Sequence, residues 1–121
     1  MRVEKEELKK IFMELLALKS RYQRSASWRV IWNNLINFCE SRGVKISEAK
    51  YLTVRRRAWG SYCPLLSKIY IQRRNIKDMV EVLAHEVGHV IAFKAGILKK
   101  YAFDEDIADE LGYTIMDILS R

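Results

Sequence analysis

The sequence predicts an α+β fold, with residues 1–121 forming a single domain in which helices cover one face of a small antiparallel sheet of about three strands. Two observations support this expectation. Apolar residues recur every three to four positions at both ends of the chain, which is the helical period, whereas short alternating runs with turn residues occupy the middle. Half of the residues are hydrophobic and only six are Gly or Pro, so a disordered or linker-like chain is excluded.

Two helices are expected before the sheet. The first covers residues 3–22, where Leu8, Ile11 and Leu15 fall on one face and Glu and Lys fill the positions between them. The second is capped by Ser25 or Ser27, because either hydroxyl can accept a bond from a free backbone N–H, and it ends at Gly43.

Short β-like runs follow the second helix. The strands are expected in "YLTVRRR" (51–57) and "SKIYIQR" (67–73), with "AWGSYCPLL" (58–66) as the turn region between them. Asn75 then caps a long helix that continues to about Lys94 and has Gly96 just past its end. Asp104 caps a last helix that extends close to the carboxyl end.

The long helix carries the strongest functional pattern in "VLAHEVGHVIAF". His85 and His89 are the two histidines of the chain and lie one helical turn apart, so both imidazoles project from the same face and can converge on one ion. Glu86 lies beside them. This is the HExxH arrangement, in which two histidines hold zinc and the glutamate polarises a bound water.

A catalytic zinc needs a third protein ligand, and the segment "YAFDEDIADELGY" offers five carboxylates for that role. Glu105 and Asp109 share a face of the last helix, and the small Ala108 between them lets two helices approach closely. We rank Glu105 first as the ligand, ahead of Asp109 and then Glu110. If Glu105 is the ligand, Asp109 lies deeper and accepts the outer N–H of a zinc-bound histidine.

"HEVGH" followed after fifteen residues by "EDIAD" resembles the gluzincins, whose signature is HExxH followed by a helix with E-x-x-A/S/G-D. The resemblance implies that His85, His89 and Glu105 bind the metal and that Glu86 is the general base and acid. In size and order of elements the chain is similar to the minigluzincins, small zinc metallopeptidases. The segment "RRAWGSYCPLLSKIYIQ" more weakly resembles the SprT-like hydrolases, and the combined match covers about residues 55–113.

The resemblance also implies further roles around the cleft. Lys68, Ile69, Tyr70 and Ile71 form the rim strand to which an extended peptide would add through main-chain hydrogen bonds, although Ile69 and Ile71 also fit core positions. Tyr101 and Tyr113 are candidates for stabilising the oxyanion, because they flank the glutamate helix. Minigluzincins tend to be latent, which raises the expectation of self-inhibition or self-association.

Charge and terminal composition bear on partners and location. The net charge is +7, and the basic residues cluster in "RYQRSASWR", "VRRRAWG" and "YIQRRNIK", which allows a nucleic-acid partner although a solvated basic surface explains them as well. A charged amino terminus and the lack of a long apolar run predict a cytoplasmic protein without a membrane span. Cys39 and Cys63 are expected to be reduced.

Zinc-dependent peptide hydrolysis is therefore the expected function, with a peptide or an unfolded protein as the substrate. Two other classes stay open: a DNA-associated protease of the SprT-like kind, and a noncatalytic regulatory module that zinc stabilises. The remaining interpretation is a pair of helical histidines that bind no metal. It is the weakest of these hypotheses, because the E-x-x-A-D pattern follows the histidines.

Overall fold

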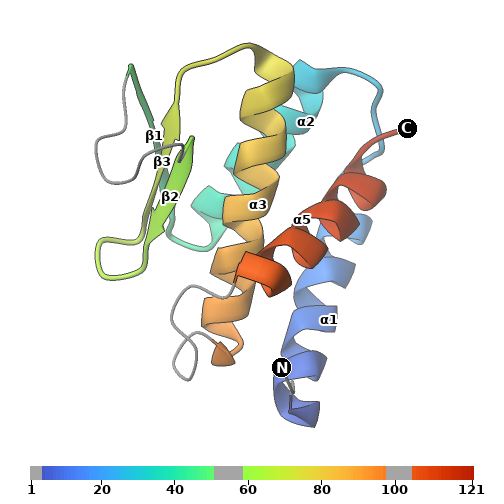
Figure 1. Cartoon of the computed structure of the whole chain (residues 1–121). Coiled ribbons are helices and arrows are strands. Elements are labelled where there is room, and N and C mark those ends of the chain that lie inside the picture. Colours follow the sequence, from blue (N-terminus) through green and yellow to red (C-terminus); the bar gives the residue numbers. More distant parts are fainter. Residues whose placement is uncertain (1–3, 51–58, 98–104) are drawn as a thin grey trace.

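The computed structural model describes residues 4–50, 59–97 and 105–121 and confirms the α+β fold, with helices and a three-stranded sheet in the expected order (Figure 1). The elements in chain order are α1 (Lys5–Arg21), α2 (Trp28–Ser41), β1 (Lys45–Ala49), β2 (Gly60–Cys63), β3 (Lys68–Gln72), α3 (Ile76–Lys94) and α5 (Glu105–Leu119).

Polar side chains begin two of the helices as the sequence predicts. The Ser27 hydroxyl accepts a hydrogen bond from the Val30 N–H at α2, and the Asn75 side chain accepts one from the Asp78 N–H at α3. Each cap satisfies a backbone donor that has no partner within the helix. The chain leaves α2 through Gly43, whose positive φ of 75° favours a residue without a Cβ. The expected cap Asp104 lies outside the described residues.

The sheet differs from the expected antiparallel one because it is mixed. Its strand order is β1-β3-β2, with β1 parallel to β3 and β2 antiparallel to β3. β2 lies inside the segment predicted as a turn, since only Pro64–Ser67 are needed to reverse the chain into β3. The run predicted as a strand at 51–57 lies outside the described residues. Alternation in a sequence predicts a strand but not the direction of its neighbour, which explains the error.

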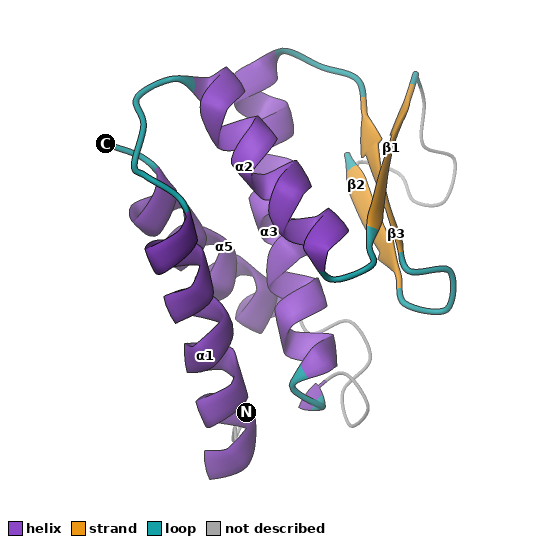
Figure 2. Cartoon of the chain, turned by 180° about the vertical axis from the view of Figure 1, so that it is seen from behind, coloured by secondary structure: helices purple, strands orange, loops and turns teal. Residues whose placement is uncertain are grey.

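Helix α3 lies at the centre of the fold, between the sheet on one side and α1 and α5 on the other, with α2 behind it (Figures 1 and 2). Most of its residues between Met79 and Ala92 are buried, in agreement with this position. The inner face of the sheet supplies Ile69 and Ile71, both fully buried. Because α3 packs against the sheet, α2 and α5, its position in the fold is fixed, and so are the directions in which its side chains project.

Both cysteines are free thiols, in line with the expectation of reduced residues. Cys39 is buried in the core, and this burial raises the pKa of its thiol to about 12 because the thiolate would lose its hydration. Among the described residues, no helix combines the length and the apolar character that crossing a bilayer requires.

Candidate metal centre

The two histidines of α3 lie on the helix face that α5 covers. His85 and His89 are one turn apart, and their ring centroids are 4.9 Å from each other with the planes nearly perpendicular. His89 is almost completely buried, at 3% exposure, whereas His85 is partly accessible. The pair therefore forms the inner wall of a site that solvent can reach from the His85 side.

Glu105, in the first turn of α5, meets both imidazoles. Its Oε2 lies 2.8 Å from His85 Nε2 and its Oε1 lies 3.1 Å from His89 Nε2. One nitrogen of each histidine and one carboxylate oxygen of Glu105 all lie within 4.8 Å of one another. The residue that the sequence ranks first as the third ligand is thus the carboxylate that the structure brings to both histidines.

A crossing of α3 and α5 built from small residues allows this meeting. A Cβ at Gly88 would lie 2.7 Å from the Ala108 carbonyl oxygen, and a Cβ at Gly112 would lie 3.1 Å from His85 Cα. Ala108 is fully buried at the same crossing. Because larger side chains would push the helices apart, these residues set the reach of Glu105. Ala108 was predicted for this purpose, whereas Gly88 and Gly112 were missed.

Asp109 lies one turn after Glu105 and contacts the other side of His85. Its Oδ1 is 2.7 Å from His85 Nδ1, so this carboxylate can accept a hydrogen bond from the Nδ1–H group. That bond favours the tautomer with the proton on Nδ1 and a lone pair on Nε2, the nitrogen that faces Glu105. His89 Nδ1 is buried and has no hydrogen-bond partner among the described residues. Burial lowers the pKa of His89, and the nearby Glu105 carboxylate opposes this effect only in part. The neutral form of His89, which is the form that binds metals, is therefore favoured.

Glu86 is buried at 5% exposure on the side of α3 that faces the sheet. A Cβ placed on Gly60 would lie 3.2 Å from Glu86 Oε2 and 2.5 Å from Val82 Cγ1, so the glycine lets strand β2 lie directly against this carboxylate. Gly60 belongs to the "WGS" segment, but the sequence alone did not reveal this role. The arrangement puts a buried carboxylate against the main chain of β2.

The rim strand predicted at Lys68, Ile69, Tyr70 and Ile71 needs correction. These residues lie in β3, which is the central strand, so its backbone is already paired with β1 and with β2. β1 and β2 are the two edge strands, and no described strand pairs with the outer edge of either; β2 is the one whose Gly60 lies against Glu86. β1 pairs with the edge of β3 that β2 leaves free, and this puts β3 inside the sheet and β2 at its border.

Of the two candidate tyrosines, the structure describes Tyr113 only. Tyr113 lies on α5, two turns beyond Glu105, and its side chain is 73% exposed. Such exposure leaves its phenol in water, where an oxyanion would gain little from it. Tyr101 lies outside the described residues.

The donor set fits a zinc ion. A neutral imidazole that donates its Nδ1–H to Asp109 keeps a lone pair on Nε2, and in His85 this lone pair faces Glu105, as it would if both were ligands of one cation. Neighbouring ligand atoms around a tetrahedral zinc ion are about 3.3 Å apart, close to the 2.8 Å and 3.1 Å contacts of Glu105. Two imidazole nitrogens with one carboxylate are also a ligand set that catalytic zinc uses.

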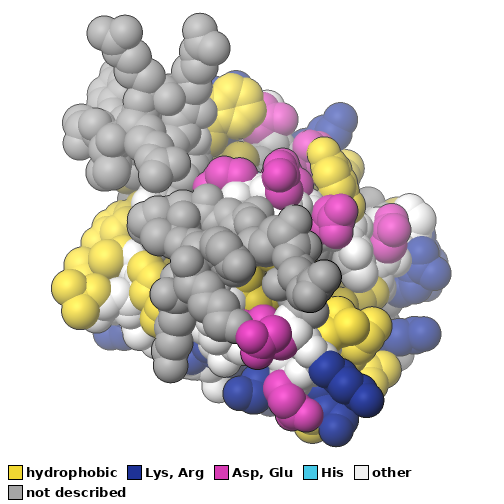
Figure 3. Space-filling view, turned by 60° about the horizontal axis from the view of Figure 1, so that its bottom comes forward, with side chains coloured by type: hydrophobic (Ala, Val, Ile, Leu, Met, Phe, Trp, Pro, Cys, Tyr) yellow, Lys and Arg dark blue, Asp and Glu magenta, His cyan; other side chains and the backbone are white. Residues whose placement is uncertain are grey.

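The surface around the centre is acidic although the chain is basic overall. Helix α5 exposes Glu105, Asp106, Asp109 and Glu110 in its first two turns. The space-filling view from below shows several acidic side chains on this side of the molecule, together with Lys and Arg side chains (Figure 3). Such a face attracts divalent cations and positively charged ligands.

Comparison with known proteins gave no further guide to function. No protein-family model matches the chain, and no curated protein and no solved structure matches it significantly.

Proposed function

We propose that the chain is a zinc-dependent metallopeptidase in which His85, His89 and Glu105 hold the ion. The observation that carries the proposal is the meeting of the Glu105 carboxylate with the Nε2 atoms of both histidines, at 2.8 Å and 3.1 Å. Asp109, on the outer nitrogen of His85, supports the same reading, because zinc-binding histidines need an outer partner that fixes their tautomer.

Zinc bound there would lower the pKa of water toward neutrality and polarise the carbonyl of the peptide bond to be cleaved. Glu86 accepts a proton from the attacking water while the water oxygen forms a bond to the carbonyl carbon. Glu86 then gives that proton to the amide nitrogen as the C–N bond breaks. The burial of Glu86 against Gly60 keeps its carboxylate in one place for both transfers.

The outer edge of β2 is the proposed guide for the substrate. The Gln72 N–H donates to the Trp59 carbonyl, so Trp59, Ser61 and Cys63 point their main-chain groups toward β3. The main-chain groups of Gly60 and Tyr62 therefore point away from β3, and Gly60 lies against Glu86. An extended peptide that pairs with these groups passes the carboxylate that must protonate it.

The test combines metal analysis with cleavage of an unfolded protein. We expect about one zinc per chain in the wild type and almost none in His85→Ala. Glu86→Gln should keep its zinc and lose at least about 100-fold in cleavage rate, whereas the matched control Glu81→Gln, an exposed glutamate of the same helix, should keep both. Undiminished cleavage by Glu86→Gln, or a wild type without zinc, would refute the proposal.

A zinc-bound wild type that cleaves no unfolded protein under any condition would also refute the peptidase and would favour the noncatalytic module. Specific activity that falls with rising protein concentration would indicate latency through self-association, whereas constant specific activity would exclude that form of latency.

A further inference from the structure

A second concave site lies at the opposite end of α5 from the metal centre. It is an open groove of about 1080 Å³, and neither the histidines nor the acidic residues of the first α5 turns contribute to it. The groove lies between the end of α1, the connection to α2 and the last turns of α5. We call it the α1–α5 groove, and its lining consists of Lys19, Ser20, Arg21, Tyr22, Gln23, Arg24, Thr114, Asp117, Ile118 and Arg121.

The walls of the groove are held together by the backbone. The Ser25 N–H donates to the Leu119 carbonyl and the Arg121 N–H donates to the Ser25 carbonyl. The Arg24 Nε also donates to the Ser120 carbonyl at 2.8 Å, which fixes the direction of that guanidinium. The groove is thus a built feature of the fold, formed by segments that are far apart in the sequence.

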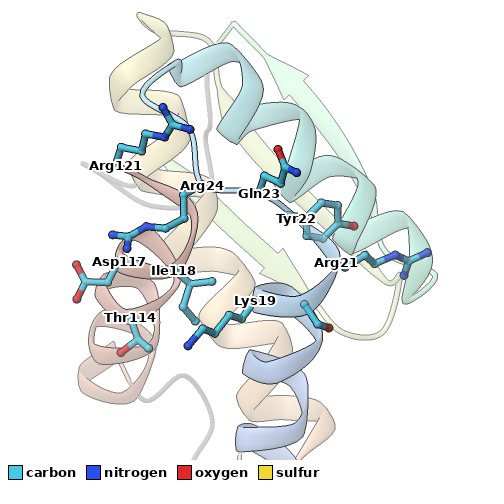
Figure 4. Close-up of a pocket in the computed structure, with 10 residues that line it drawn as sticks. Lys19, Arg21, Tyr22, Gln23, Arg24, Thr114, Asp117, Ile118 and Arg121 are labelled. Atoms are coloured by element: carbon cyan, nitrogen blue, oxygen red, sulfur yellow. The ribbon is translucent and has the colours of Figure 1, made fainter.

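The charge of the groove lining is positive, because four cationic side chains stand against one acidic side chain. Lys19, Arg21 and Arg24 have no ion-pair partner within the described part of the chain, and Arg121 adds a fourth cationic side chain to the lining. Asp117 is the acidic side chain of the lining. Figure 4 shows Lys19 and Arg24 reaching from the α1 side toward α5, where Asp117 and Thr114 lie.

We propose that the α1–α5 groove binds single-stranded nucleic acid through its phosphates. Cationic side chains without ion-pair partners along a groove are the electrostatic requirement for holding a phosphate backbone. The lining also contains Tyr22, a half-buried aromatic residue whose accessible part can contact a base, and Gln23 and Thr114, which can hydrogen-bond to bases and sugars. A concave lining receives a thin single strand, whereas duplex reading needs an element that projects into a DNA groove.

The test is fluorescence anisotropy of a labelled twelve-nucleotide oligothymidylate with the full chain, at several salt concentrations. Four cationic side chains predict that log K falls with log salt at a slope of about −2 to −3, since each phosphate contact of a single strand contributes about −0.7. Lys19→Gln/Arg21→Gln should weaken binding about tenfold at low salt and flatten the slope by about 1.4.

Two matched variants make the site assignment sharp. Lys9→Gln/Lys10→Gln removes the same charge from exposed positions of the same helix and should leave affinity within about twofold. Asp117→Asn should tighten binding a few-fold, because it removes the opposing charge in the groove, whereas Asp106→Asn on the same helix should not. Equal losses in both lysine-containing double variants would overturn the groove as the site.

Inorganic polyphosphate separates nucleic acid from phosphate alone. Tyr22→Leu should weaken oligothymidylate about fivefold or more and leave polyphosphate binding unchanged, because only the oligonucleotide has bases to stack. Equal binding of both polymers, unaffected by Tyr22→Leu, would overturn the nucleic-acid proposal. His85→Ala should bind the oligonucleotide as the wild type does, so this proposal and the proposed peptidase function can fail independently.

Discussion

The crossing of α3 and α5 gives the sharpest prediction, which concerns Gly88→Ala. The new Cβ would lie 2.7 Å from the Ala108 carbonyl oxygen and 3.1 Å from Leu111 Cβ, and the first of these neighbours is backbone that cannot rotate away. Relieving the clash to the 3.4 Å at which ordinary contact begins requires α5 to move by about 0.7 Å. Glu105 and Asp109 would move with it.

Two magnitudes follow from that displacement. Because the 2.7 Å contact is with backbone, overpacking should cost about 2–3 kcal/mol, and the better helix propensity of alanine returns about 1 kcal/mol, so the free energy of unfolding should fall by about 1–2 kcal/mol. Zinc sites tolerate ligand distances within only about 0.2 Å of ideal, so zinc affinity should fall much more than stability does. Gly112→Ala, whose nearest contact is 3.1 Å, should show both effects more weakly.

The assays are urea unfolding with a chelator present, which reports the crossing alone, and competition for zinc against a chromophoric chelator. If Gly88→Ala unfolded at the same urea concentration as the wild type, the close crossing would be refuted. If it unfolded earlier yet bound zinc as tightly, the dependence of the metal site on that crossing would be refuted.

Three other predictions follow from the same structure. Asp109→Asn should weaken zinc binding by about 10–100-fold in the chelator competition, because the amide holds the His85 imidazole less strongly; unchanged affinity would exclude that role. At pH 8 iodoacetamide should alkylate Cys63 and spare the buried Cys39, as peptide mapping would show, whereas both should react in urea. The raised pKa of Cys39 also means that its thiol favours the folded state fully below pH 9, the pKa of an unperturbed cysteine, and loses that contribution as pH rises toward 12. The unfolding free energy of the wild type should therefore fall more steeply than that of Cys39→Ala between those values, by up to about 1.4 kcal/mol per pH unit, and equal slopes in urea titrations would contradict it.

Local patterns were sufficient for the parts of the site that lie on one helix. The four-residue spacing of His85 and His89 determines that they share a face in any helix, and the same holds for Glu105 and Asp109. The caps at Ser27 and Asn75 were likewise predictable, because they depend on the N–H groups of the next turn only. These are short-range consequences of helical geometry.

Relations between distant segments were predicted less well. The strand order put β3 inside the sheet and β2 at its edge, and no property of residues 60–72 alone reveals which strand of a hairpin finds a third partner. The close approaches at Gly60, Gly88 and Gly112 were also missed, although a glycine inside a helix is a signal that a neighbouring element lies close.

The sequence by itself determined that two imidazoles and a glutamate share one helix, that an acidic helix follows, and that both belong to an α+β domain. Only the tertiary structure decided which carboxylate reaches both imidazoles, which strand lies against Glu86, and that four cationic residues from three segments line one groove. Helical periodicity acts over a few residues and can be read along the chain, whereas the distance between two elements depends on how all the side chains between them pack.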